Sequence, residues 1–161
     1  MKSDNANNTD TPRIETTAEI AIAGYTRSYK FSDPSQIPAQ WANFAQQIPQ
    51  LTSIANPETF GIIYNGSADN FDYLTGIEVS AEQNIPDSMT TLQLGSQTYA
   101  VYQHSDNVAT LGHTCGEIWS ERLPASGYMP VQAPWFERYG DSFDPTTGDG
   151  GMEVWIPIEQ M

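Results

Sequence analysis

Three residues of one short segment could bind an organic cation. Trp135, Glu137 and Tyr139 alternate along a predicted strand, so their side chains point to the same side of it. A carboxylate supplies the charge opposite to that of a cation. The faces of aromatic rings attract cations by about 0.5 to 2 kcal/mol per contact, depending on desolvation. The segment therefore predicts one wall of a site for a positively charged organic molecule.

The orientation of Glu137 decides whether this wall exists. Its side chain could face solvent on an edge strand or face inward between the two rings, and the aromatic neighbours favour the inward orientation. A buried carboxylate without a partner is costly and has a raised pKa, so an inward Glu137 requires a protein partner or a cationic ligand. Arg138 points to the opposite face of the strand and is a poor partner for it.

Four further residues are candidates for ligand contact. Glu153 and Trp155 share one face of a later predicted strand, although a solvated structural role is the simpler interpretation of Glu153. Tyr64 and Trp119 are most simply core residues, and they could also line the site. The predicted ligand-binding set is Glu137, Trp135, Tyr139, Tyr64, Trp119, Glu153 and Trp155.

The common sequence-readable enzyme motifs are missing from the chain. It has no nucleophile elbow, phosphate-binding loop, dinucleotide fingerprint or zinc-protease motif. His104 and His113 lack the paired spacing of metal ligands, and Cys115 lies on a helical stripe as a buried, inert thiol. No catalytic residue, metal ligand or cofactor is therefore predicted.

The charge of the chain restricts its partners. Its 161 residues include 20 acidic and 6 basic side chains, a net charge of −14. Such a chain repels phosphate backbones and anionic lipid and attracts cations and basic protein surfaces. This argues against direct binding of nucleic acid or membranes and leaves a small cation or a basic protein as the partner.

The hydropathy, the N-terminal stretch and the cysteine content indicate where the protein resides. No run approaches the roughly 18 to 20 apolar residues of a membrane span. Residues 1–12 form a polar stretch that lacks the apolar core of a secretory signal and is predicted to be a disordered tail. The single Cys115 agrees with a reducing compartment. The sequence predicts a soluble, cytoplasmic protein.

Residues 13–161 are predicted to form a single domain of two similar halves, about 13–82 and 97–158. Each half has the element order strand, helix, strand, strand, which we interpret as internal duplication. Identical residues recur 75 positions apart: Tyr64 and Tyr139, Gly76 and Gly151, Glu78 and Glu153, Val79 and Val154. At the same offset Glu137 corresponds to Ile62, so an apolar position of one half is an acid in the other.

The first half is predicted to contain strands at 14–29, 60–64 and 73–81. Its helix begins after Pro34 and ends at Pro49, with an apolar stripe of Ile37, Trp41, Phe44, Ala45 and Ile48. Residues 82–96 are predicted to be a connector between the halves.

The second half is predicted to contain strands at 97–104, 135–139 and 152–158. Asp106 or Asn107 caps its helix, and Pro124 closes it. The apolar stripe of this helix is Val108, Leu111, Cys115, Ile118 and Trp119. The two halves together predict an α+β fold with helices on one face of an antiparallel sheet and a central cleft where the halves meet.

Four segments carry a resemblance to a known family: Gln97 to His104, Leu123-Pro124 with Ser126 to Tyr128, Pro134 to Tyr139, and Met152 to Ile158. From about residue 13 to the end, the chain resembles the GyrI-like family, also known as the AraC-type effector-binding domain of bacterial multidrug-sensing transcription regulators. The resemblance implies a hydrophobic central cleft in which an acid receives lipophilic cations. Glu137 falls on the family's Phe-Glu-x-Tyr position, so that role is assigned to it.

The resemblance also leaves alternatives open. Regulators of this family carry a helix-turn-helix domain, whereas a short polar tail precedes the first predicted strand here, which implies a stand-alone ligand-binding module. Some stand-alone relatives restrain DNA gyrase, and others hydrolyse reactive small molecules. A homodimer formed through an exposed edge strand is equally compatible with the sequence.

Overall fold

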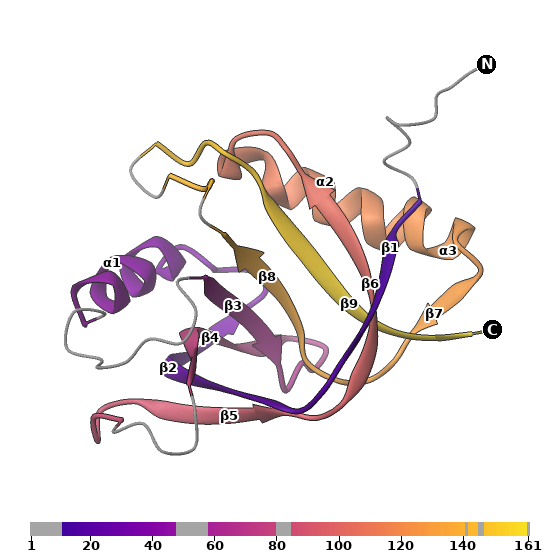
Figure 1. The fold of residues 1–161 in the computed structure, drawn as a ribbon. Helices are drawn as coiled ribbons and strands as arrows, with labels where there is room; N and C mark the ends of the chain where they lie inside the picture. The colour runs from indigo at the N-terminus through magenta and orange to yellow at the C-terminus, as the bar shows by residue number, and fades with distance from the viewer. Residues whose placement is uncertain (1–10, 48–57, 80–84, 141, 145–146, 161) are drawn as a thin grey trace.

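The protein is described by a computed structural model that covers residues 11–47, 58–79, 85–140, 142–144 and 147–160. Its strands form an antiparallel sheet, and its helices lie on one face of that sheet (Figure 1). The elements are β1 (Arg13–Thr17), β2 (Ile20–Lys30), α1 (Ile37–Gln47), β3 (Thr59–Tyr64), β4 (Asn70–Val79), β5 (Thr90–Leu94), β6 (Gln97–His104), η3 (Val108–Thr110), α2 (Leu111–Glu117), η4 (Ile118–Arg122), α3 (Leu123–Ala125), β7 (Tyr128–Pro130), β8 (Trp135–Tyr139) and β9 (Met152–Gln160).

The order of the strands confirms the predicted α+β architecture. The sheet runs β1-β6-β9-β8-β3-β4-β2-β5, and β7 pairs with β9 outside this path. Strands β8 and β3 meet at the centre. The second half contributes β6, β9 and β8 on one side of this seam, and the first half contributes β3, β4 and β2 on the other.

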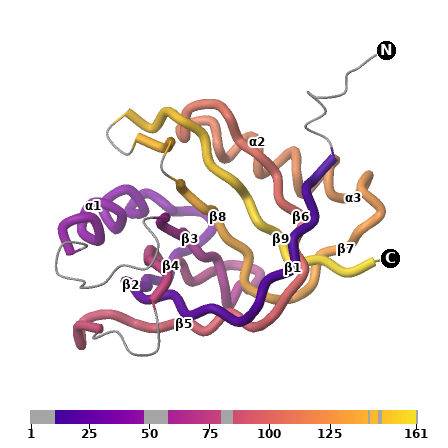
Figure 2. The backbone as a smooth tube through the Cα atoms, in the orientation of Figure 1, coloured from indigo at the N-terminus to yellow at the C-terminus, as the bar shows by residue number. Residues whose placement is uncertain are grey.

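The outer strands are exchanged between the halves. Strand β1 precedes β2 in the chain but pairs with β6, and β5 precedes β6 but pairs with β2. Figure 2 shows β1 running alongside β6. The predicted single strand over 14–29 is therefore wrong: the chain leaves the strand at Ala18 and Glu19 to cross from one half of the sheet to the other. The predicted connector over 82–96 likewise contains a strand, β5.

Helix α1 places two aromatic rings against the sheet. Asp33 opens the turn before it by accepting hydrogen bonds from the backbone N–H and the hydroxyl of Ser35. Trp41 and Phe44 then pack on the sheet, whereas Ala45, predicted to belong to the same stripe, is exposed. The predicted end of the helix at Ile48 and Pro49 lies outside the described residues.

The second helical region follows the predicted stripe and continues further than predicted. The Asn107 side chain caps it by accepting a hydrogen bond from the N–H of Ala109, 2.9 Å away. Pro124 does not close the helix, which ends at Ala125. Proline is tolerated there because it stands in the first turn of α3, where its missing N–H is not needed. A π-helical turn, Ile118–Arg122, joins α2 to α3.

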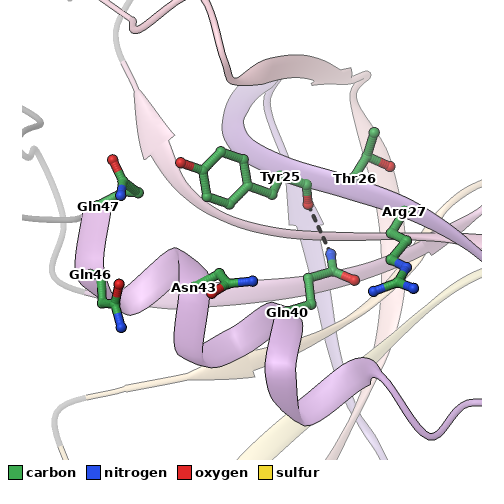
Figure 3. Close-up of a pocket in the computed structure, with 7 residues that line it drawn as sticks. All are labelled: Tyr25, Thr26, Arg27, Gln40, Asn43, Gln46 and Gln47. Carbon is green, nitrogen blue, oxygen red and sulfur yellow. Dashed lines mark hydrogen bonds between the residues drawn. The ribbon is translucent and has the colours of Figure 1, made fainter.

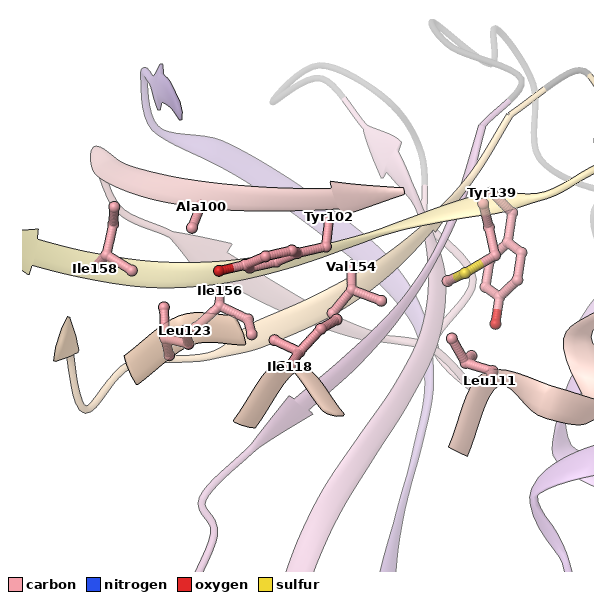
Figure 4. Close-up of a cluster of buried hydrophobic side chains, with 10 residues drawn as sticks. Ala100, Tyr102, Leu111, Ile118, Leu123, Tyr139, Val154, Ile156 and Ile158 are labelled. Atoms are coloured by element: carbon pink, nitrogen blue, oxygen red, sulfur yellow. The ribbon is translucent and has the colours of Figure 1, made fainter. Parts of the chain in front are cut away.

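Alternation along the strands separates two apolar layers. The helix-covered face holds a core of side chains from β6, β8, β9 and the second helical region (Figure 4). Smaller clusters around Phe44 and Tyr73 lie on the same face beside α1. The opposite face carries its own cluster, which includes Phe60, Phe136 and Trp155.

The strand register corrects the comparison of the two halves. Gly61 pairs with Glu137, and Ile62 pairs with Phe136. Ile62 lies in the cluster on the face opposite the helices, whereas Glu137 lies on the helix-covered face. The equivalence of Glu137 and Ile62 is therefore wrong, because a shift of one residue moves every side chain of a strand to the other face.

Helices of the described residues are too short or too polar to cross a membrane.

Candidate functional site

Strand β8 places the predicted acid and its two aromatic neighbours on the helix-covered face. Phe136 belongs to the cluster on the opposite face, so Trp135, Glu137 and Tyr139 share the other side of the strand. The prediction from alternation is confirmed for these three residues. β8 lies at the centre of the sheet, between α1 and α2 as Figure 1 shows. The edge-strand orientation considered for Glu137 is therefore wrong.

Two tyrosine hydroxyls hold the Glu137 carboxylate. The hydroxyl of Tyr139 donates to Oε1 from 2.9 Å, and that of Tyr73, on β4, donates to the same oxygen from 2.8 Å. The indole Nε1 of Trp41 in turn donates to the Tyr73 hydroxyl from 3.0 Å. Helix α1, the first half of the sheet and β8 of the second half are thus connected through one carboxylate oxygen.

The carboxylate is partly buried and has no cationic partner in the part of the chain that the structure describes. Burial raises the pKa of the Glu137 carboxyl, and the hydrogen bonds from Tyr73 and Tyr139 act against this by stabilising the charged form. Burial and the neighbouring Glu137 charge raise the pKa of both tyrosines well above its usual value. Both hydroxyls therefore remain protonated donors at neutral pH.

Arg138 is occupied elsewhere, as predicted. Its guanidinium lies on the opposite face, donates to Glu58 Oε1 from 2.6 and 2.9 Å, and lies over the rings of Phe60 and Trp155. The residue next to Glu137 in the sequence thus packs on the face opposite the helices and leaves the Glu137 charge unpaired.

Aromatic rings and one thiol surround the carboxylate. The rings of Trp119 and Trp135 meet edge to face with centroids 5.5 Å apart, and Trp119 is 36% exposed. The ring of Trp41 meets that of Tyr139 in the same manner at 5.2 Å. Cys115, from α2, is close enough that burial and the Glu137 charge together raise the pKa of its thiol to about 12. This arrangement gathers one negative charge, several aromatic rings and a thiol on the helix-covered face of β8.

The other three predicted residues lie on the opposite face of the sheet. Trp155 stacks on Phe136 there and donates from Nε1 to Glu153 Oε1, 2.9 Å away. Glu153 also accepts a hydrogen bond from Arg13, and this pair raises the pKa of the guanidinium. Tyr64 packs at the edge of the same cluster. The structure therefore does not bring Tyr64, Glu153 and Trp155 together with Glu137.

A polar hollow of about 400 Å³ lies beside α1 and β2 (Figure 3), and Glu137 is not among its lining residues. Its lining includes Arg27 and the amide side chains of α1, and Gln40 is held at its base by donating to the backbone carbonyl of Tyr25 from 2.9 Å. Within the described residues, His, Cys, Asp and Glu side chains nowhere gather in threes as a metal site would need.

Sequence reasoning did not single out Tyr73 or Gly61, and it interpreted Trp41 most simply as one of several core aromatic residues, some of which could also line the groove. Tyr73 is 64 positions from Glu137 in the sequence and reaches it only through the β4-β3-β8 register. The signal that could have found it is the alternation of Phe71, Tyr73 and Thr75, which extends beyond the start of the predicted strand and marks a single face.

Comparison with known proteins places the chain in a family. The family described as "Cass2: Integron-associated effector binding protein" matches residues 13–158. The transcriptional regulator BrlR of Pseudomonas aeruginosa is 27% identical over 120 residues, which make up 73% of this chain and 44% of that protein. The chain thus spans less than half the length of this curated relative.

Solved structures share the fold at low identity. A putative transcription regulation protein of Staphylococcus aureus MU50 superposes with a TM-score of 0.67 at 18% identity, covering 92% of this chain and 97% of that one. An integron cassette protein of Vibrio cholerae gives 0.66 at 16%, covering 92% and 96%. SAV2435, solved bound to tetraphenylphosphonium, gives 0.63 at 19%, covering 92% and 93%.

The predicted resemblance to effector-binding domains is therefore confirmed. Because the family match extends over nearly the whole described chain, this protein belongs to the Cass2 family of integron-associated effector binding proteins.

Proposed function

We propose that this protein binds lipophilic organic cations at Glu137, with Trp135, Tyr139 and Trp119 as the surrounding rings. The observation that carries the proposal is a partly buried carboxylate, held by two tyrosine hydroxyls, for which the described residues provide no positive charge. Such a carboxylate is destabilised by desolvation, and a cation bound beside it restores the lost electrostatic interaction.

The tyrosines favour binding over hydrolysis. The raised pKa of both phenols keeps them protonated, so they serve as donors that fix the carboxylate. A phenol acting as a general base would need a lowered pKa near the working pH. SAV2435, which shares this fold, was solved with tetraphenylphosphonium, and this supports the same ligand class here.

A ligand of this class gains from charge and from ring contact together. Each cation–π contact contributes about 0.5 to 2 kcal/mol, depending on desolvation. Trp119 and Trp135 are both partly exposed, so ring surface remains available for such contacts. Promiscuity among cations of similar size is expected, since one charge and several rings impose few directional demands.

The proposal is tested by titrating the protein with three compounds of similar shape: tetraphenylphosphonium, the anion tetraphenylborate and the neutral triphenylphosphine oxide. Calorimetry should detect binding of the cation and much weaker binding of the other two. Glu137→Gln should weaken cation binding by on the order of 2 to 5 kcal/mol, because a buried charge pair is lost.

Glu153→Gln is the matched control. It removes the same charge from the protein, also beside an indole ring, but on the opposite face of the sheet. Its affinity for the cation should equal that of the wild type. Equal losses in both variants would reduce the effect to general electrostatic attraction by an acidic protein, and no loss in Glu137→Gln would refute the role of this carboxylate.

A further inference from the structure

A glycine lies directly beneath the carboxylate. Gly61 occupies β3 and pairs with Glu137 of β8 across the central seam of the sheet. It is fully flanked, because β4 pairs with the other edge of β3 at Thr75. Its φ angle is not positive, in contrast to Gly127, Gly148, Gly150 and Gly151, so the backbone conformation does not require glycine here.

The side chains of Tyr73 and Glu137 already occupy the space that a side chain at position 61 would need. A Cβ atom at this position would clash with the hydroxyl oxygen of Tyr73 and would lie 2.9 Å from Cζ of the same ring. It would also lie 2.8 Å from Oε1 of Glu137. Distances under 3.0 Å require one of the groups to move.

The backbone of β3 cannot provide that movement. Pairing to β4 on one side and to β8 on the other fixes its position within the sheet. The Tyr73 side chain would have to shift, and it would lose both the hydrogen bond that it donates to Glu137 and the one that it accepts from Trp41.

Both tyrosine hydroxyls act on the same carboxylate oxygen. They donate to Oε1, and Oε2 has no hydrogen-bond partner among the described residues. The hydrogen bonds therefore fix the rotation of the carboxylate and leave Oε2 as the oxygen that is free to meet a ligand.

We propose that Gly61 is a positioning residue for ligand binding: its missing side chain admits the Tyr73 hydroxyl to Oε1 of Glu137 and so presents Oε2 to the cation. This rests on the proposed function of Glu137. Gly61 itself touches no ligand and acts through Tyr73.

A double-mutant cycle with tetraphenylphosphonium tests this inference. Gly61→Ala and Tyr73→Phe should each weaken binding by about tenfold or more, the range expected for loss of a hydrogen bond to a charged group. In the double variant the Tyr73 hydroxyl is already gone, although the added Cβ still crowds Oε1 of Glu137, so the combined loss should be smaller than the product of the two single losses. Gly112→Ala is the control, since a Cβ there meets no atom within 4 Å, and should bind as the wild type does.

A second measurement does not depend on any ligand. The titration of the Glu137 carboxyl is followed by ¹³C NMR, with its signal assigned by comparison with Glu137→Gln. The titratable groups facing it are Tyr73 from β4, Tyr139 from β8 and Cys115 from α2, all with raised pKa, so Glu137 alone titrates at acidic to neutral pH. Gly61→Ala and Tyr73→Phe should both raise the pKa of Glu137.

The outcomes separate the two proposals. Wild-type affinity and titration in Gly61→Ala would overturn the inference, as would losses that multiply in the double variant. If Gly61→Ala alone does not fold, the comparison of Tyr73→Phe with the double variant decides the question, and a further tenfold loss there would contradict it. If the wild type binds no cation, the proposed function fails, and the NMR titration still decides the role of Gly61.

Discussion

The Tyr139 hydroxyl and the Glu137 carboxylate lie two residues apart on β8 and are joined by a hydrogen bond of 2.9 Å. Because residues i and i+2 of a strand point to the same face, the sequence places this donor beside its acceptor. Tyr73 then adds the second donor from another strand. The charge that defines the candidate site is therefore held partly by its own strand and partly by the fold.

Tyr139→Phe should shift the pH dependence of the site. The variant keeps the ring that packs on Trp41 and removes the hydrogen bond that stabilises the charged form of Glu137. The pKa of Glu137 should rise, so cation binding should be lost at a higher pH than in the wild type. The free energy of unfolding at neutral pH should fall by about 1.5 to 3 kcal/mol. Titrations at several pH values and urea denaturation measure the two effects.

Tyr99→Phe is the control for this change. Tyr99 is a buried tyrosine whose ring packs on Phe136 and Trp155 on the opposite face. Its substitution should leave the pH profile of binding unchanged. An identical profile in Tyr139→Phe and the wild type would contradict the role given to the Tyr139 hydroxyl.

Glu137→Gln should stabilise the folded protein at neutral pH. The pKa of Glu137 is higher in the folded state than its ordinary value, so the folded state binds a proton more readily and the free energy of unfolding falls as the pH rises through this pKa. The neutral amide of the variant avoids that loss. The gain should be about 1.4 kcal/mol for each unit by which the pKa is raised, and it should vanish below the ordinary carboxyl pKa.

Urea denaturation of the wild type and the variant over a pH series checks this expectation, with Glu153→Gln as the control for lost charge. A stability difference that stays constant with pH would mean that ionisation of Glu137 does not destabilise the folded protein. A gain in stability together with a loss of cation binding would show that the site carries a charge unfavourable to folding.

Trp119→Ala should weaken cation binding by about 1 kcal/mol through loss of one cation–π contact. Its effect on stability should be smaller than that of a core substitution, because the side chain is 36% exposed. Phe31→Ala removes an aromatic ring that is 56% exposed beyond the end of β2 and serves as the control. Calorimetric titration should show a loss for Trp119→Ala alone, and equal losses would remove Trp119 from the site.

Cys115 should react slowly with iodoacetamide and faster in Glu137→Gln. The thiolate is the reacting form, and with a pKa of about 12 only about one thiol in ten thousand is ionised at pH 8. Part of that shift comes from the Glu137 charge, so its removal should increase the rate. The alkylation rate, measured by mass spectrometry, should reach that of an ordinary thiol when the protein is unfolded in urea. Equal alkylation rates in both folded proteins would mean that the Glu137 charge does not affect the Cys115 thiol.

Local patterns predicted which residues of one strand share a face, and they could not predict which faces of different strands join. Trp135, Glu137 and Tyr139 lie together as alternation required. Glu153 and Trp155 also share a face as predicted, but the pairing of Phe136 with Trp155 turns that face away from Glu137. Register between strands is set by tertiary packing, which a single sequence does not display.

Two features of the strands were not predicted from the sequence. Strand β5 was missed although Leu92 and Leu94 alternate with polar residues, because the segment is short and lies in a polar stretch. The break between β1 and β2 was missed because alternation continues across it. It is caused by a change of pairing partner, which leaves no mark in the local pattern.

Because the outer strands are exchanged, the edge strand of each half of the sheet comes from the other part of the chain. β1, which starts the first repeat, finishes the sheet of the second, and β5 does the reverse. A chain divided between the repeats would leave β6 and β2 with unsatisfied backbone hydrogen-bonding groups, which invite aggregation. The two fragments should therefore be insoluble apart and should complement each other only when refolded together.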